Sequence, residues 1–167
     1  MPNWIEGTFR ARGNKDNIKK FILEGLEACY RLKITTEIEE NDDSLYVTFK
    51  NPEAAENDKI EYPKTLHIKD TRRNFIEDLC MGEIYAYKKE NGEFQFASSF
   101  KSAWAIDTEP LANIAKKYEI DIRVNGYEKG MQFEQLLEVS RNGTVKCESF
   151  IQYEDYEWEC QMPLLGG

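Results

Sequence analysis

The residues with the clearest potential for chemistry lie in a basic cluster at positions 67–74. Two guanidinium groups beside the start of a helix are typical of a site for a phosphate or a carboxylate. The alternative interpretation is a surface turn whose arginines pair with the many acidic side chains of this chain. A glutamate in a later turn could add a general acid or base, although such a residue is usually a solvated charge. The candidate ligand-binding residues are His67, Thr71, Arg72, Arg73 and Glu128.

No catalytic motif accompanies this cluster. His67 is the single histidine, and no serine or cysteine lies in a nucleophile motif near it. The four cysteines contain no Cys-x-x-Cys pair, so we expect reduced thiols and no zinc or iron–sulfur site. The spacing of Asp121, Glu128, Asp155 and Glu157 does not compel a shared metal ion. The sequence therefore predicts no cofactor, no metal and a non-enzymatic role.

A second kind of surface is expected at the end of the chain. After Lys146 there is no Lys, Arg or His, whereas five acidic residues alternate with aromatic ones. Aromatic rings supply contact area and carboxylates attract cationic partners, so this segment suits a basic protein. A second acidic block at residues 37–43 either joins this surface or is a solvated hairpin tip. The candidate partner-binding residues are Asp42, Asp43, Glu154, Asp155, Tyr156, Glu157 and Trp158.

Length and composition limit the class of protein. The 167 residues fit a single domain, 1–167, with possible sub-lobes 1–80 and 81–167. A formal charge of −9, from 31 acids and 22 bases, opposes general nucleic-acid binding but leaves room for a local basic patch. The start of the chain has neither a basic nor an apolar region of a signal peptide, and no apolar run approaches a membrane span. We therefore expect a cytoplasmic protein that binds no membrane.

Hydrophobic periodicity predicts the elements that position these residues. Alternation from Ile5 to Ala11 predicts a strand, and helical spacing from Ile18 to Cys29 predicts a helix capped by Asn14 or Asp16. A second helix should begin at its cap Thr108 and end near residue 118, and a short helix is expected at 71–77. Further strands are expected at 34–38, 45–49, 60–68, 83–88, 93–98, 120–124, 133–139 and 145–151, with an exposed loop at 51–59. This order predicts an α+β fold in which helices lie on one face of a mostly antiparallel sheet.

Several motifs also resemble a known family of proteins. They are Met1-Pro2-Asn3-Trp4, His67-Ile68-Lys69-Asp70-Thr71-Arg72-Arg73-Asn74-Phe75-Ile76, Ala103-Trp104 with Glu109-Pro110-Leu111, Gly126-Tyr127-Glu128-Lys129-Gly130-Met131-Gln132-Phe133 and Asp155-Tyr156-Glu157-Trp158-Glu159-Cys160. Together they are similar to the YubB-like group of small ferredoxin-like-domain proteins carried by phages and mobile elements of Gram-positive bacteria. The resemblance implies a ferredoxin-like α+β fold with two main helices on one face and no iron–sulfur cluster. It supplies no catalytic residues.

Charge and resemblance together give one leading hypothesis and two rivals. The leading hypothesis is a phage or mobile-element protein that inhibits a host nucleic-acid-targeting defence complex, as anti-CRISPR proteins do, by occupying a basic channel. Its partner would be a basic host protein or nucleoprotein complex. The first rival is a small-ligand or nucleotide-binding module built on the residue 67–73 cluster and Glu128. The second rival is a structural or self-assembling accessory protein.

Overall fold

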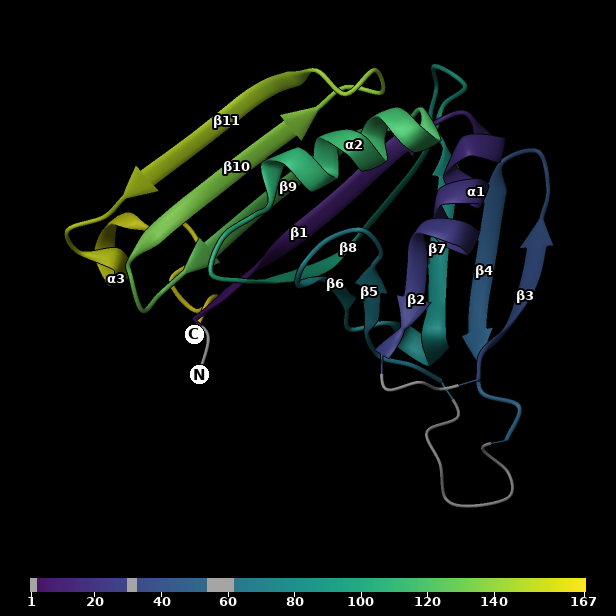
Figure 1. Cartoon of the computed structure of the whole chain (residues 1–167), viewed down its shortest axis with the longest axis horizontal. Helices are drawn as coiled ribbons and strands as arrows, with labels where there is room; N and C mark the ends of the chain where they lie inside the picture. Colours follow the sequence, from purple (N-terminus) through teal and green to yellow (C-terminus); the bar gives the residue numbers. More distant parts are fainter. Residues whose placement is uncertain (1–2, 30–32, 54–61) are drawn as a thin grey trace.

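The structure is a computed structural model that describes residues 3–29, 33–53 and 62–167. Within these residues, eleven strands form one sheet and three short helices accompany it (Figure 1). In chain order the elements are β1 (Trp4–Gly13), α1 (Lys15–Gly25), β2 (Leu26–Ala28), β3 (Thr35–Glu40), β4 (Ser44–Lys50), β5 (Leu66–Ile68), β6 (Asn74–Glu77), the 3-10 turn η3 (Cys80–Gly82), β7 (Glu83–Lys88), β8 (Phe94–Ala103), α2 (Thr108–Tyr118), β9 (Asp121–Glu128), β10 (Phe133–Val139), β11 (Val145–Gln152) and α3 (Tyr156–Glu159).

The sheet branches at β8. This ten-residue strand pairs with β1 along its whole length, from Trp4↔Ala103 to Gly13↔Phe94. On its other side, the first residues of β8 pair with β7 and the last ones pair with β6. One arm therefore continues as β7-β4-β3 and the other as β6-β5-β2, while β1 continues through β9 and β10 to β11. The named pairings are all antiparallel.

The hydrophobic core lies between one face of this sheet and the helices α1 and α2 (Figure 1). Helix α1 begins as its sequence requires, because the Asn14 side chain accepts a hydrogen bond from the Asn17 amide at 2.8 Å. Its buried side chains, Ile18, Phe21 and Ile22, face the sheet. The residues of α2 that face the core are Leu111, Ile114, Ala115 and Tyr118.

The predicted ferredoxin-like α+β fold, with two main helices on one face, is wrong. Between α1 and β8 the chain contributes six strands, β2 to β7, which enlarge the sheet to eleven strands accompanied by three short helices. Three of these strands, β2, β5 and β6, have only three or four residues. Such strands are too short to show a period of two in the sequence.

Several local predictions also fail. The helix expected to reach Cys29 ends at Gly25, because Leu26–Ala28 pairs with β5 as strand β2. Of the strand expected at 60–68, the described residues form only Leu66–Ile68. The helix expected at 71–77 is partly strand β6, in which Asn74 and Ile76 are buried and Ile76 lies opposite Phe100 of β8. Cross-strand pairing therefore overrides helical propensity there. Thr108 is not the cap of α2, because Asp107 holds the cap position and the Thr108 hydroxyl donates instead to Glu148 at 2.6 Å. Most of the predicted 51–59 loop lies outside the described residues.

Candidate functional site

The C-terminal segment, residues 153–167, folds back on itself through its own acidic side chains. Asp155 caps the short helix α3 by accepting a hydrogen bond from the Trp158 amide at 3.3 Å. Glu159 reaches back in the opposite direction and accepts the amides of Glu154, at 3.0 Å, and Asp155, at 3.3 Å. This reciprocal arrangement satisfies amides that a helix start leaves unpaired. The carboxylates of Asp155 and Glu159 therefore stabilise the fold of this segment in addition to carrying negative charge.

A buried tyrosine attaches this segment to the sheet. Tyr156 is 2% exposed, packs with Tyr127 and Cys160, and donates its hydroxyl to the Leu165 carbonyl at 2.9 Å. Burial raises the pKa of the Tyr156 hydroxyl above its ordinary value. The last residues are tied down as well, because the Gly167 amide donates to the Trp4 carbonyl of β1 at 3.2 Å. Tyr156 is thus an internal anchor of the segment and offers no ring to a partner.

Trp158 is the aromatic residue that this segment presents to solvent. Its side chain is 87% exposed, and Leu164 in the same segment is 92% exposed. Glu157 beside it pairs with Lys129 at 3.1 Å, whereas the Glu154 carboxylate makes no hydrogen bond or ion pair with the part of the chain that the structure describes. The segment is therefore ordered by its own contacts while it exposes a large aromatic side chain among carboxylates.

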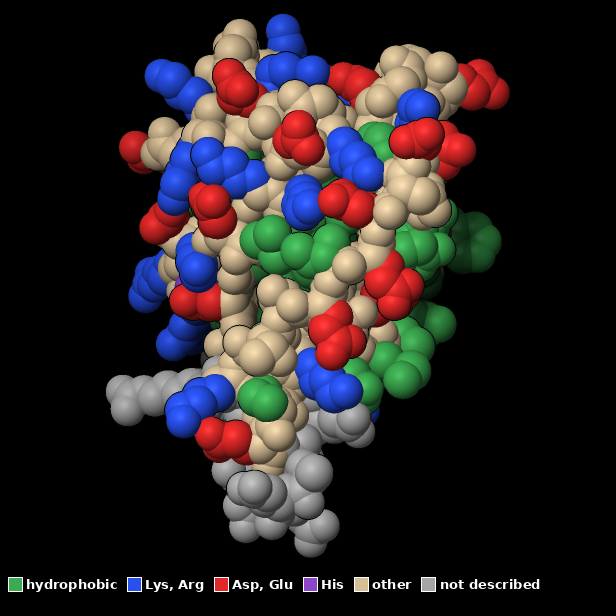
Figure 2. Space-filling view, turned by 90° about the vertical axis from the view of Figure 1, so that its right-hand side faces the viewer, with side chains coloured by type: hydrophobic (Ala, Val, Ile, Leu, Met, Phe, Trp, Pro, Cys, Tyr) green, Lys and Arg blue, Asp and Glu red, His purple; other side chains and the backbone are tan. Residues whose placement is uncertain are grey.

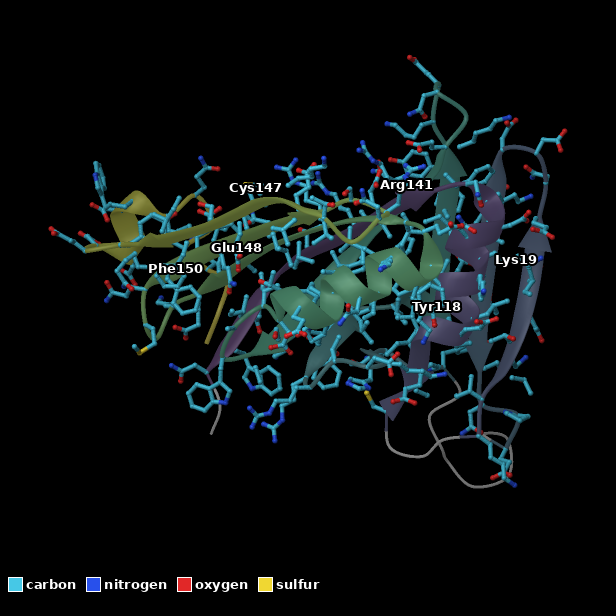
Figure 3. All side chains as sticks on the ribbon, turned by 45° about the horizontal axis from the view of Figure 1, so that its top comes forward. Lys19, Tyr118, Arg141, Cys147, Glu148 and Phe150 are labelled. Carbon is cyan, nitrogen blue, oxygen red and sulfur yellow. The ribbon has the colours of Figure 1, made fainter. Side chains whose placement is uncertain are left out.

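Strand β11, which leads into the segment, is also largely exposed. Phe150 lies on the α2 side of the strand, where it stacks on Phe133 at 4.8 Å between ring centroids, and Glu148 lies on the same side (Figure 3). The neighbouring Ile151 lies on the opposite side of the strand and is exposed. Apolar contact area thus continues from the C-terminal segment onto β11.

Asp42 and Asp43 lie far from this segment, at the other end of the molecule (Figure 1). They form the β3–β4 turn, in which Asn41 accepts the amides of Asp43 and Ser44. Asp43 also pairs with Lys88 at 3.4 Å. Viewed from the β3 side, Lys and Arg side chains alternate with Asp and Glu around a central group of hydrophobic side chains (Figure 2). The two acidic blocks therefore do not combine into one negative surface.

Two residues of the basic cluster at positions 67–74, His67 and Thr71, lie together in the structure, where they form the turn between β5 and β6. His67 of β5 contacts Glu27 through Nδ1 at 2.9 Å and the Thr71 carbonyl through Nε2 at 3.1 Å. The buried Thr71 hydroxyl donates to the Ile68 carbonyl at 2.6 Å and accepts the Asn74 amide at 3.3 Å. These contacts close the β5–β6 turn and occupy both ring nitrogens of His67 and the hydroxyl of Thr71.

Glu128 does not join this turn. Strands β1, β8 and β6 separate β9, which carries Glu128, from β5. The Glu128 carboxylate is buried and accepts the amides of Gly130 and Met131, so it closes the β9–β10 turn. Arg72 and Arg73 are exposed and make no ion pair within the described residues. Among those residues, no group of three His, Cys, Asp or Glu side chains is placed to hold a metal ion.

A third cluster, which was not among the sequence predictions, lies on the sheet face opposite α1 and α2. We term this face the open face. Arg10 and Arg12 of β1 and Arg123 of β9 lie on it, and Arg10 lies directly opposite Arg123 in the strand register. The alternation of β1 shows that its arginines face away from the core. Only the order of strands in the sheet shows that Arg123 joins them.

An acid at the end of this face makes a pH-dependent contribution to stability. Asp121 accepts hydrogen bonds from Arg12 at 3.0 Å and from the Arg141 side chain at 2.8 Å. Burial by itself would raise the pKa of Asp121, but the hydrogen bonds from Arg141 and Arg12 outweigh it and lower the pKa to about 2. Because the pKa is lower in the folded state, the stabilisation is present above about pH 4 and is lost as the pH falls towards 2.

We therefore expect Asp121→Asn to lower the free energy of unfolding at pH 7 by about 1 kcal/mol, since solvent screens the partly exposed arginines. Urea denaturation from pH 7 to pH 2 measures this difference, which should shrink below pH 4. Asp42→Asn is the control, because its carboxylate is exposed in a turn, and it should change little at any pH. A difference that stays constant across the pH range would contradict this role of Asp121.

In comparisons with known proteins, no protein-family model, curated protein or solved structure matches the chain. The resemblance to the YubB-like group therefore stays a prediction. No helix in the described ranges is long and apolar enough to cross a membrane. The proposals below are consequently argued from this chain's own residues.

Proposed function

We propose that this protein is a non-enzymatic binding protein whose C-terminal segment docks onto a basic protein. The observation that carries the proposal is Trp158, which is 87% exposed on a segment that is nevertheless fixed by Tyr156 and by its own carboxylates. Burying an indole ring of this size is favourable, and tryptophan is enriched among the residues that dominate binding energy. A fixed segment also loses little conformational freedom on binding.

Charge specifies the kind of partner. Residues 147–167 contain five acidic side chains and no basic one. Lys129 is positioned against only one of these carboxylates, that of Glu157. A partner surface rich in Lys and Arg would be attracted to this end of the molecule, and the attraction would weaken with added salt.

The finer proposal concerns the identity of that partner. We propose a nucleic-acid-processing defence complex of the host, acting in the cytoplasm, because such complexes carry basic channels that an acidic face can occupy. The net charge of −9 and the resemblance to phage and mobile-element proteins support this choice. The C-terminal segment alone would form the contact, since Asp42 and Asp43 lie at the opposite end.

A matched pair of charge reversals tests the docking surface. Glu154→Lys with Glu157→Lys reverses two exposed charges of the segment without removing the caps made by Asp155 and Glu159. We expect this variant to bind a purified partner, first captured from host lysate, about tenfold or more weakly. Isothermal titration calorimetry at two salt concentrations measures the affinity, whose salt dependence should also decrease.

The control has the same change in net charge at the far end of the protein. Glu37→Lys with Glu39→Lys alters two exposed residues of β3 and should leave the affinity nearly unchanged. Equal losses in the two variants would show that net charge alone matters, and an unchanged affinity in the Glu154/Glu157 variant would refute docking by this segment.

A further inference from the structure

The open face contains two like charges held directly opposite each other. Arg10 of β1 faces Arg123 of β9 across the antiparallel ladder and faces Ala97 of β8 on its other side. Like charges in this position are destabilising. Arg123 has a partner in Glu138 at 3.6 Å, but Arg10 makes no ion pair with any described residue, although acids outnumber bases in this chain. Arg10 is therefore the member of the pair that has no counter-charge among the described residues, and an anion from outside the chain would supply one.

Hollows in the surface surround this pair. A cavity of about 150 Å³ is lined by Arg10, Arg12 and Arg123. Asp121 and Glu138, the partners of Arg12 and Arg123, also line it, so Arg10 is its one arginine without an ion pair among the described residues. A neighbouring cavity of about 240 Å³ shares Arg10 and Arg123 and is also lined by Leu165 of the C-terminal segment. Both guanidinium groups therefore face space that a ligand can enter, and together they can bind a phosphate through several charge-assisted hydrogen bonds.

Aromatic rings lie across β8 from the arginines. Tyr46, Tyr85 and Tyr87 form a ladder in which neighbouring ring centroids are 4.6 and 5.9 Å apart. Tyr85 and Tyr87 line a third cavity of about 350 Å³, whose other wall includes Ala97, the residue opposite Arg10. Tyr87 lies opposite Gln95 of β8, and Gln95 lies opposite Arg12 of β1. Since adjacent strands are about 4.8 Å apart, Tyr87 lies roughly 10 Å from Arg12. The base and phosphate of one nucleotide can span this separation.

We propose that the open face binds a nucleotide. Arg10 and Arg123 hold its phosphate, and the tyrosine ladder stacks on its base. A free nucleotide fits better than a strand, because the protein's charge of −9 repels a long polyanion. The residues proposed to contact the nucleotide are not the acidic and aromatic residues proposed to contact the partner protein, although Leu165 of the C-terminal segment lines one of the cavities. Either proposal can therefore fail without the other.

Isothermal titration calorimetry with AMP, ATP, inorganic phosphate and a ten-nucleotide single strand tests the proposal. We expect AMP or ATP to bind, Arg10→Ala to weaken that binding about tenfold or more, and Tyr85→Ala to weaken it about tenfold. Tyr85→Ala should not change the binding of inorganic phosphate. The control is Arg72→Ala with Arg73→Ala, which removes two exposed arginines outside the open face and should leave the affinity unchanged.

A loss of nucleotide affinity in Arg10→Ala would not be due to misfolding. Because Arg10→Ala removes the repulsion from Arg123, its melting temperature without ligand should equal or exceed that of the unaltered protein. The proposal is overturned if neither nucleotide nor phosphate binds at about 10 mM, if Arg10→Ala binds as well as the unaltered protein, or if the single strand binds more tightly than the free nucleotides.

Discussion

Replacing Phe9 with alanine is expected to lower the free energy of unfolding by about 4 kcal/mol. Phe9 lies in the middle of β1, is fully buried, and contacts the rings of Phe21, Phe96 and Phe100 at centroid distances of 5.9 to 6.2 Å. These rings join α1 to β8, the strand at which the sheet branches. The alanine variant loses the transfer free energy of the ring and leaves a cavity that the surrounding strands cannot fill.

Urea denaturation followed by circular dichroism measures this effect, with Phe9→Leu as the matched control. Leucine keeps most of the apolar volume, so its cost should be about 1.5 kcal/mol. A loss below about 1 kcal/mol for Phe9→Ala would show that the four rings do not form the centre of the core.

Replacing Tyr156 with alanine should cost about 3 kcal/mol locally and release the C-terminal segment from the sheet. The ring is the main buried group of the segment, and its hydroxyl fixes Leu165. Hydrogen exchange should therefore accelerate at the amides of Trp158 and Gly167, while the amides of β1 and β8 keep their protection. Because the segment must then be ordered on binding, affinity for the partner should fall as well.

Tyr156→Phe separates the ring from its hydrogen bond. This variant keeps the packing against Tyr127 and Cys160 and loses only the bond to Leu165, so its cost should be about 1 kcal/mol and the segment should stay in place. The anchoring role would be contradicted if Tyr156→Ala accelerated hydrogen exchange uniformly across the sheet, or if it did not accelerate exchange in the C-terminal segment.

The sequence predicts the long elements better than the short ones, for a physical reason. The alternation from Ile5 to Ala11 and the helical spacing of Ile18, Phe21 and Ile22 reflect burial on one face, and both appear in the structure as β1 and α1. Strand β6 is set instead by its pairing with β8, which the local sequence from Thr71, interpreted as a helix start, does not reveal. Pairing between distant strands, and hence the branched sheet, is not a local property.

The same distinction applies to the candidate sites. The acidic, aromatic character of residues 147–159 is visible in the sequence, but the inward direction of Tyr156 and the outward direction of Trp158 depend on the tertiary packing. Thr71 and Glu128 were predicted to bind a ligand, but both close turns. In the sequence, a polar residue that closes a turn cannot be distinguished from one that binds a ligand. The pairing of Arg10 with Arg123 follows only from the register of β1 and β9.

Hydrogen exchange on the complex with the captured partner tests the docking proposal most directly. We expect slower exchange on binding in β11 and the C-terminal segment, centred on Trp158, and no change in the β3–β4 turn that contains Asp42 and Asp43. Protection confined to the β3–β4 turn or to the turn at Arg72 and Arg73, with none around Trp158, would contradict the proposed function.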